Sequence, residues 1–397
     1  MISPAEAEAL IRAHAAALPA TSLPLTELVG ATLRERIVAT LDHPPFHRVS
    51  MDGIGFAFAA YERGRRAFRI AGTQAAGTPP LSLNDAEHCI EVMTGASLPR
   101  GCDCVVPVEK ISVADGVARL ADDAAPAKDA NIHASGSDVR RGAELLPPGT
   151  CLGPAEIAVL AANGRTHAQV TRRPRIVVIS TGDELVEPGQ PVAGWQIYRS
   201  NAYAVMAALQ RRGFGLPTLD HLPDDRAVLR TRLGAHLQTH DVLILSGGVS
   251  MGKFDYVPQV LAELGVRVIF HKVAQRPGKP LWFGVGPAGQ TVYALPGNPV
   301  STVVCLGRYV FAGLEASLGR PPRAVELVEL AEPFEVKPAL TLFIPVRLAA
   351  EQALRRAVPQ PTRGSGDFTS LVGTDGFVEL PGPGAIAAGT PVASYSW

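Results

Sequence analysis

The chain has 397 residues, enough for two to four domains at the usual size of roughly 100–200 residues each. Hydrophobic residues make up 47% and charged residues 19%, which is typical of a globular protein with a large core. Lysine plus arginine equals aspartate plus glutamate at 37 each, so no overall charge attracts nucleic acid or an anionic membrane.

The N-terminus and the cysteines indicate the compartment. The first segment, "MISPAEAEALIRAHAAALP", lacks a signal peptide's basic start and apolar run, and no stretch approaches the ~20 apolar residues that span a bilayer. It predicts a helix instead, with Ser3 as N-cap, Pro4 at the first position and Glu6 closing a capping box. Five scattered cysteines without a CxxC pair indicate a reducing compartment. We therefore expect a cytoplasmic protein, with Cys102 and Cys104 as small core residues.

The residue pattern changes along the chain and predicts four domains in a multidomain α/β plus β protein. Residues 1–42 and 136–172 are expected to form a helical linker domain. Residues 43–135 contain short β-like segments between Gly, Pro and Asp-Gly turns and predict a β-rich inserted module. Residues 173–320 alternate strand and helix, which predicts a doubly wound α/β domain with a mostly parallel sheet. Residues 321–397 predict a small β-barrel, with a sandwich as the alternative.

The α/β region has a regular order of elements. Its β-branched and apolar runs predict strands at 175–180, 215–221, 241–245, 266–272, 281–283 and 292–295. Its remaining periodic segments predict helices at 198–212, 225–239, 256–264 and 299–318.

Three of these strands run into polar, glycine-containing loops: "TGDE" at 181–184, "SGGVS" at 246–250 and "PGNPVS" at 296–301. Each alone has an ordinary explanation, because a Gly-Gly is usually a turn, Asn298-Pro299 is a common helix start and Asp255 could cap the next helix. Ligands of open α/β sheets bind at the carboxyl ends of the strands, where glycine and helix-start amides suit an anion. Three such loops together predict a pocket for a phosphorylated or otherwise anionic molecule. No GxGxxG follows the first strand, so a dinucleotide site is not expected.

A basic cluster lies between the second and third loops. Lys272, Arg276 and Lys279 occur in "HKVAQRPGKPLWF", where prolines and a glycine constrain the backbone. On charge alone, a solvated surface turn explains them equally well. Three acidic residues, Glu184, Asp224 and Asp255, are expected at the same carboxyl edge of the sheet. Together with them, the basic cluster predicts a site for a polyanion and a divalent metal.

Six motifs in one order resemble a known family over essentially the whole chain. "SMDG", "VMTGASLPRGCDCVVPVE", "STGDELVEPG", "SGGVSMGKFDYV", "RPGKP" and "LPGNPVS" are similar to motifs of the molybdopterin molybdotransferases, the MoeA family that includes the C-terminal domain of gephyrin. The resemblance implies a Mg²⁺-dependent transferase that inserts molybdate into adenylated molybdopterin and releases AMP. It also implies an α/β domain of molybdopterin-binding type and a homodimer, with each site shared between that domain and the partner's β-rich module. A molybdopterin adenylyltransferase and molybdoenzyme acceptors are the implied protein partners, with no nucleic acid or membrane.

The resemblance also implies roles for individual residues. The implied catalytic residues are Asp52, Thr94, Glu184, Asp224 and Asp255, with Asp224 and Asp255 as the Mg²⁺ ligands; Asp183 is expected to cap and orient its loop. The loops after the strands give Thr181, Gly182, Ser246, Gly247, Gly248 and Ser250 as expected substrate-binding residues, and the resemblance adds Lys272, Arg276, Lys279, Pro296, Pro299, Ser301 and Ser365. Arg276 stands where the family often has lysine, which keeps the charge but changes the hydrogen-bond geometry.

Two segments depart from the family pattern. Before "MDG" the chain reads "FHRVS" instead of the common Phe-Asp-Asn-Ser-Ala, and Ile54 replaces an aromatic residue. The first departure has three explanations. The loop is a subfamily variant with the same chemistry, or Arg48 adds a contact to the ligand, or the protein is a paralogue that uses another oxyanion such as tungstate. In the last domain, Leu340 and Pro345 occupy the positions around a family arginine, and we hypothesise that Arg347 replaces it from the same strand face.

Two other functions remain open. A nucleotide pyrophosphatase on the same α/β fold would need no β-rich modules at both ends. A non-catalytic molybdopterin carrier or scaffold would be expected to lose its acids first, whereas Asp52, Glu184, Asp224 and Asp255 are all present.

Overall fold

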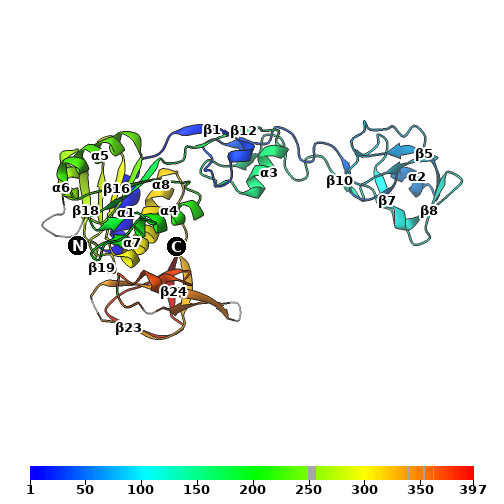
Figure 1. Cartoon of the computed structure of the whole chain (residues 1–397). Coiled ribbons are helices and arrows are strands. Elements are labelled where there is room, and N and C mark those ends of the chain that lie inside the picture. Colours follow the sequence, from blue (N-terminus) through cyan, green and yellow to red (C-terminus); the bar gives the residue numbers. More distant parts are fainter. Residues whose placement is uncertain (249–255, 338, 352–353, 361) are drawn as a thin grey trace. The chain divides into compact units, whose positions relative to one another are not determined.

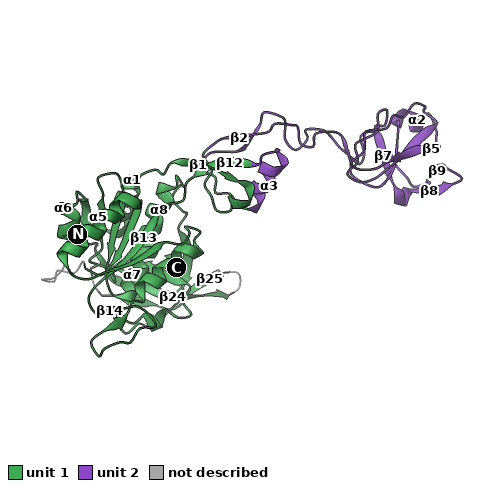
Figure 2. Cartoon of the chain, turned by 45° about the horizontal axis from the view of Figure 1, so that its top comes forward, with its two compact units in different colours: residues 1–34, 149–153, 167–397 green, residues 35–148, 154–166 purple. Residues whose placement is uncertain are grey.

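The computed structural model describes residues 1–248, 256–337, 339–351, 354–360 and 362–397 (Figure 1). The chain divides into two compact units (Figure 2). Unit 1 comprises residues 1–34, 149–153 and 167–397, and unit 2 comprises residues 35–148 and 154–166. None of the helices in the described ranges has the length and apolar character needed to span a bilayer.

A six-stranded sheet forms the centre of unit 1. Its order is β16-β13-β17-β21-β20-β18, in which β16, β13, β17 and β21 are mutually parallel and β20 is antiparallel to both β21 and β18. The expected mostly parallel sheet is therefore confirmed, with a β20–β21 hairpin at one side. The strands are β13 (Ile176–Thr181), β16 (Thr218–Leu222), β17 (Val242–Ser246), β18 (Arg267–His271), β20 (Trp282–Val285) and β21 (Thr291–Leu295).

Helices cover both faces of this sheet (Figure 1). Along β13, Ile176 and Val178 join a core cluster with α1, α4, α7 and α8, whereas Val177 and Ile179 join another with α5 and α6. This alternation follows from the two-residue period of a strand, and it explains why the whole strand is apolar. The helices are α1 (Pro4–His14), α4 (Asn201–Arg211), α5 (Arg226–Thr239), α6 (Val257–Glu263), α7 (Pro299–Cys305) and α8 (Phe311–Ser317).

Two helices differ from their expected form. Helix α1 has the predicted capping box, in which Ser3 Oγ accepts from the Glu6 amide and the Glu6 carboxylate accepts from the Ser3 amide. However, its buried Ala7 and Ile11 belong to the core of the α/β sheet. The long helix expected at 299–318 is divided into α7 and α8 by a π-helical turn at Leu306–Val310.

The C-terminal residues of unit 1 form a closed five-stranded barrel, which confirms a barrel over a sandwich. Its strands pair in the cycle β24-β25-β22-β28-β26 and back to β24, and β19 (Gln275–Arg276) adds to β24. The barrel strands are β22 (Glu326–Leu330), β24 (Thr341–Glu351), β25 (Leu354–Pro359), β26 (Gly376–Leu380) and β28 (Pro391–Ser396), beside the pair β23 (Phe334–Val336) and β27 (Gly384–Ile386).

Unit 2 contains the expected β-rich module. Its sheet has the order β7-β4-β6-β5-β9-β8, and its core includes stacked Phe56 and Phe68 with the buried thiols Cys102 and Cys104. The strands are β4 (Gly53–Phe56), β5 (Ala67–Gln74), β6 (His88–Val92), β7 (Cys104–Pro107), β8 (Ile111–Ala114) and β9 (Val117–Leu120), with helix α2 (Phe58–Glu62). A short pair, β3 (Arg48–Val49) and β10 (Ile132–His133), lies beside it.

The ranges expected to be helical, 1–42 and 136–172, contain less helix than predicted. They contain the α-helices α1 and α3 (Pro154–Ala162) and a 3₁₀ turn at Leu25–Glu27, and the other elements are short strands. In unit 1, β1 (Ala20–Pro24) pairs with β12 (His167–Thr171), and in unit 2, β2 (Ile37–Val38) pairs with β11 (Glu144–Leu146). Proline, glycine and β-branched residues in these segments favour this outcome.

Candidate functional site

The three polar loops of unit 1 lie next to one another at the carboxyl edge of the sheet. Strands β13, β17 and β21 are adjacent and parallel, with Ser180 aligned to Ser246 and Ser246 aligned to Leu295. Their loops therefore leave the sheet side by side, as the sequence predicts. Val249–Asp255 of the second loop, including the predicted Ser250 and Asp255, lie outside the described residues.

Two glycines allow the second loop to lie directly against the end of β13. Gly247 and Gly248 have φ angles of +96° and +67°. A Cβ on Gly247 would lie 2.8 Å from the Thr181 carbonyl oxygen, and one on Gly248 would lie 2.8 Å from Thr181 Oγ1. Glycine is required here both by backbone conformation and by the close approach.

Asn201, at the start of α4, connects the second and third loops. Its Nδ2 donates to Ser246 Oγ at 2.8 Å and to the Gly297 carbonyl oxygen at 2.7 Å. One side-chain amide thereby fixes the spacing between the ends of β17 and β21. The sequence interpretation missed this residue, because an asparagine in an expected helix carries no signal that it faces two distant loops.

The acids of the first loop and of residues 224–225 have distinct positions. Glu184 is exposed, and its carboxylate lies over Gly182, where an added Cβ would be 2.4 Å from Glu184 Oε2. Asp183 Oδ1 accepts from the Asp224 amide at 3.2 Å, in agreement with its expected orienting role. Asp225 caps α5 by accepting from two backbone amides. Among the described residues, no group of three or more His, Cys, Asp or Glu side chains forms a complete metal site.

Buried residues hold the backbone of the "RPGKP" loop in one position. Gln275 is fully buried, and its Nε2 donates to the Pro277 carbonyl oxygen at 3.0 Å while its Oε1 accepts from the Tyr309 hydroxyl. Gly278, at φ +90°, has no room for a side chain, because a Cβ would lie 2.6 Å from Cys305 Sγ. The neighbouring Arg276 and Lys279 are thus presented from a fixed backbone, as predicted.

Lys272 lies at the same carboxyl edge, directly after β18. Its backbone has a φ of +73°, and its amide donates to the Leu281 carbonyl oxygen at 2.9 Å. Burial, and then the positive charge of Lys272, lower the pKa of the neighbouring His271. His271 is therefore a neutral neighbour of the lysine at pH 7.

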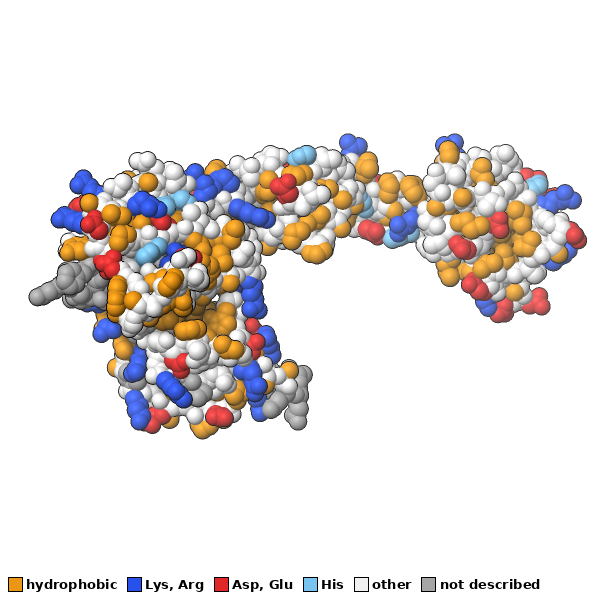
Figure 3. Space-filling model, in the orientation of Figure 1, with side chains coloured by type: hydrophobic (Ala, Val, Ile, Leu, Met, Phe, Trp, Pro, Cys, Tyr) orange, Lys and Arg blue, Asp and Glu red, His pale blue; other side chains and the backbone are white. Residues whose placement is uncertain are grey.

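A cavity of about 1050 Å³ separates the α/β sheet edge from the barrel within unit 1. Loop 275–280 and residues 296–301 line one side, including the predicted Pro296 and Ser301, while β24 and residues 362–365 line the other. Its charged lining residues are Arg276, Lys279, Lys337, Arg363, Glu332 and Glu335. Basic and acidic side chains are otherwise interspersed on the face of unit 1 shown in Figure 3. The cavity is large enough for a nucleotide-sized ligand.

Ser365 is held at the third loop by two hydrogen bonds. Asn298 Nδ2 donates to Ser365 Oγ at 2.7 Å, and the Val300 amide donates to the Ser365 carbonyl oxygen at 3.0 Å. Asn298 therefore does not cap α7 with its side chain, although Pro299 occupies the first turn as expected.

The structure places a different arginine from the predicted one at this cavity. Arg347 is exposed on β24 and is not among the described residues that line the cavity, whereas Leu340 and Pro345 are. The hypothesis that Arg347 replaces the family arginine is therefore not supported. Arg363, two residues before Ser365, does line the cavity, and the sequence interpretation missed it.

In unit 2, Asp52 and Thr94 form a close pair. The Thr94 amide and hydroxyl both donate to Asp52 Oδ1 at 2.7 Å. These backbone and side-chain hydrogen bonds hold the pKa of Asp52 below its usual value. The variant loop before it uses Arg48 internally, because Arg48 Nη2 lies 3.0 Å from His133 Nδ1.

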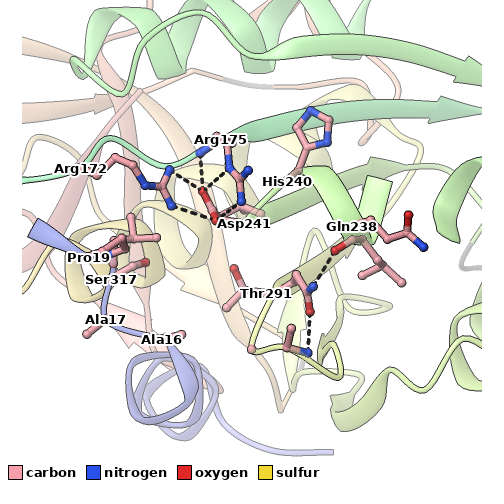
Figure 4. A pocket seen from close by; sticks show the side chains of 16 residues that line it. Ala16, Ala17, Pro19, Arg172, Arg175, Gln238, His240, Asp241, Thr291 and Ser317 are labelled. Atoms are coloured by element: carbon pink, nitrogen blue, oxygen red, sulfur yellow. Dashed lines mark hydrogen bonds and ion pairs between the residues drawn. The ribbon is translucent and has the colours of Figure 1, made fainter. Parts of the chain in front are cut away.

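A second cavity, of about 290 Å³, lies at the opposite, amino edge of the sheet (Figure 4). Arg172 and Arg175 both donate to Asp241, which directly precedes β17. Burial would raise the pKa of Asp241, but the hydrogen bonds from Arg172 and Arg175 outweigh it and lower the pKa to about 2. This ion-pair cluster joins the starts of two strands, far along the sheet from the three loops.

The chain was compared with known proteins. Family models match residues 2–164 as the MoeA N-terminal region (domains I and II), 177–316 as a probable molybdopterin binding domain and 328–397 as the MoeA C-terminal region (domain IV). A molybdopterin molybdenumtransferase of Synechocystis sp. is 41% identical over 400 residues, covering all of both chains. The chain belongs to the MoeA family.

Other MoeA-family relatives agree with this assignment. A molybdopterin molybdenumtransferase of Synechococcus elongatus is 34% identical over 96% of each chain. A crystal structure of the molybdopterin biosynthesis MoeA protein of Pyrococcus horikoshii covers this whole chain with a TM-score of 0.81 at 28% identity. Another crystal structure described as a molybdopterin biosynthesis MoeA protein of Pyrococcus horikoshii, at 24% identity and a TM-score of 0.83, supports the fold alone. The predicted family and fold class are both confirmed.

Proposed function

We propose that this MoeA-family protein inserts molybdate into adenylated molybdopterin and releases AMP, as a step of molybdenum cofactor biosynthesis. The observation that carries the proposal is the cavity of about 1050 Å³, bounded by the rigid basic loop and by the loop that carries Ser301. The names of the relatives support molybdopterin and molybdate as the substrates, and a transferase as the class of enzyme.

The residues of the cavity suit a reaction that cleaves a pyrophosphate bond. Arg276 and Lys279 would neutralise the charge that develops on phosphate and molybdate oxygens, and their fixed backbone keeps that charge in place. Asn298, on the same side of the cavity, and Ser365, on the facing side, offer further polar groups. Positioning and charge neutralisation are the main contributions a protein makes to such a transfer.

We further propose that the reaction uses Mg²⁺. The carboxylate oxygens at the sheet edge are the donor type that this ion takes, with Asp224 and Asp255 as its ligands and Glu184 shaping the end of the site. When bound, the ion would supply positive charge that offsets the charge of the substrate's phosphate groups. The other proposed substrate-binding residues are Thr181, Gly182, Ser246, Gly247, Gly248, Ser250, Lys272, Pro296, Pro299 and Ser301.

We also propose a cytoplasmic homodimer in which the partner's Asp52 and Thr94 complete each site. A molybdopterin adenylyltransferase would supply the substrate, and molybdoenzymes would accept the product. We also propose the division into four domains: residues 1–42 together with 136–172, residues 43–135, residues 173–320 and residues 321–397. A carrier and a pyrophosphatase are the competing functions, and the relatives favour neither.

The test is AMP release from adenylated molybdopterin with Mg²⁺, measured while molybdate and tungstate are titrated in parallel. We expect release to depend on molybdate and to be lost in Asp255→Ala and strongly reduced in Lys279→Met. Lys110→Met is a matched control, because Lys110 pairs with Asp123 on the surface of the β-rich module. Release without oxyanion would indicate a pyrophosphatase, and binding without release would indicate a carrier.

A further inference from the structure

Arg199 is a buried arginine whose guanidinium group is only partly paired. Its side chain is 8% exposed, and its Nη1 donates to Glu187 Oε2 at 2.8 Å. Its Nε and Nη2 are shielded from solvent and have no hydrogen-bond partner among the described residues. Because a buried charged group without partners has lost its hydration, such N–H groups normally have a ligand or other partner in the working protein.

Arg199 lies at the carboxyl edge of the sheet. It directly follows β15 (Ile197–Tyr198), which pairs in parallel with β14 (Leu185–Val186), and its own amide donates to the Val186 carbonyl oxygen at 3.0 Å. Two residues later, Asn201 contacts the second and third loops. Arg199 therefore lies between β14, which follows the first loop, and Asn201, which contacts the second and third loops.

The two unpaired nitrogens form a fork of defined geometry. Nε–H and the adjacent Nη2–H point in parallel from one side of the planar guanidinium, which matches two oxygens of a phosphate. Glu187 occupies the opposite nitrogen, and its carboxylate also accepts from the Tyr203 hydroxyl. Glu187 thus fixes the orientation of the guanidinium and leaves the fork for another anion.

We propose that Arg199 binds the pyrophosphate group of the adenylated substrate through Nε and Nη2. This inference rests on the proposed function, which supplies that group. Because the fork is covered, part of its surroundings must move when the ligand binds, and we expect this to be the chain between Glu187 and β15. That segment is lightly held, since β14 and β15 share two residue pairs and residues 187–195 are all exposed.

The experiment is calorimetric titration of the full-length protein with inorganic pyrophosphate, phosphate and AMP, without molybdate. We expect pyrophosphate to bind more tightly than phosphate or AMP, and Arg199→Met to weaken pyrophosphate binding at least tenfold. Arg199→Lys should be intermediate, because an ammonium group keeps the charge but not the fork. Arg211→Met, which removes an exposed arginine at the other end of α4, should bind as the wild type does.

Trp195 provides a second readout, because it is 69% exposed within the segment that must move. Pyrophosphate should change the tryptophan fluorescence of the wild type but not of Arg199→Met, and Trp195→Phe should remove the change. The ligand-free Arg199→Met protein should melt at the same or a higher temperature than the wild type, since the variant loses a buried unpaired group.

Several results would overturn the proposal. The first is that the wild type does not bind pyrophosphate. The second is that Arg199→Met binds pyrophosphate with the same affinity as the wild type; a lower melting temperature of this variant would then show that the arginine is structural. Equal binding of phosphate and pyrophosphate would reject the pyrophosphate assignment. If Arg199→Met does not fold, wild-type affinity in Arg199→Lys would reject the fork. Loss of molybdate-dependent AMP release with intact, Arg199-dependent pyrophosphate binding would reject the reaction but not this site.

Discussion

The side-chain amide of Asn298 donates a 2.7 Å hydrogen bond to the hydroxyl of Ser365, joining the start of α7 to a loop of the C-terminal barrel. Both residues line the cavity of about 1050 Å³. This bond therefore connects two domains of unit 1 at the place where the substrate is proposed to bind.

We expect Ser365→Ala to lower kcat/KM for AMP release roughly 2- to 10-fold, the range that corresponds to one hydrogen bond of about 0.5–1.5 kcal/mol. Asn298→Ala should cost a similar factor, and the double variant should cost less than the product of the two, because both remove the same bond. Ser370→Ala is the control, since the Ser370 hydroxyl donates to the Asp367 carbonyl oxygen. Fully multiplicative effects would show that the bond has no role in the active state.

Asn201→Asp should disrupt the spacing of the second and third loops. The variant keeps the side-chain shape but replaces the donor of both hydrogen bonds with a carboxylate beside the Gly297 carbonyl oxygen. We expect a loss of about 1–3 kcal/mol in the free energy of unfolding and weaker binding of anionic substrate. Urea unfolding followed by tryptophan fluorescence measures the free energy of unfolding, and titration calorimetry measures the binding of the anionic substrate.

The matched control for Asn201→Asp is Gln210→Glu, which adds the same charge on the exposed face of α4. Equal stability and affinity in the two variants would contradict the role of Asn201.

Thr94→Val should raise the pKa of Asp52. Hydrogen bonds from the Thr94 amide and hydroxyl stabilise the charged carboxylate, and the variant removes only the hydroxyl. The pKa should therefore move part of the way toward the ordinary aspartate value. A carboxyl ¹³C NMR titration measures this change directly. Thr73→Val, which removes a hydroxyl donor from Glu91 instead, should leave the pKa of Asp52 unchanged.

Asp241 should make the stability of unit 1 depend on pH in acid. Its pKa is about 2 in the folded protein, below its usual value, so its stabilising effect is fully present above about pH 4 and is lost as pH falls toward 2. A pKa lowered from 3.8 to about 2 corresponds to about 2.4 kcal/mol, which solvent screening at a partly exposed group reduces to about 1–2 kcal/mol.

Urea unfolding at several pH values tests this prediction, with all three tryptophans, Trp195, Trp282 and Trp397, reporting on unit 1. The difference in free energy of unfolding between the wild type and Asp241→Asn should shrink between pH 4 and pH 2. A difference that is constant over this range would contradict the assigned pKa.

Much of the α/β domain could be predicted from the sequence. The apolar run in β13 and the glycine loops after β13 and β17 are local patterns whose physical cause lies within a few residues. The π-helical turn at Leu306–Val310 was not predicted, because the apolar pattern of residues 299–318 is that of one continuous buried helix and carries no proline to divide it after Pro299. The period of a strand did not show that Arg347 lies away from the cavity, because it gives the face of a side chain but not which surface that face meets.

The sequence by itself determined the alternation of the main strands and helices in the α/β domain, the polar loops at three strand ends and the family of the chain. These depend on short-range periodicity, backbone preferences and motif order. Only the tertiary structure decided that Asn201 joins two loops, that Asn298 contacts Ser365 and that Arg199 is buried with an unpaired fork. Such contacts join residues up to 96 positions apart, as for Asn201 and Gly297. They arise from the packing of whole elements, which no local pattern of residues encodes.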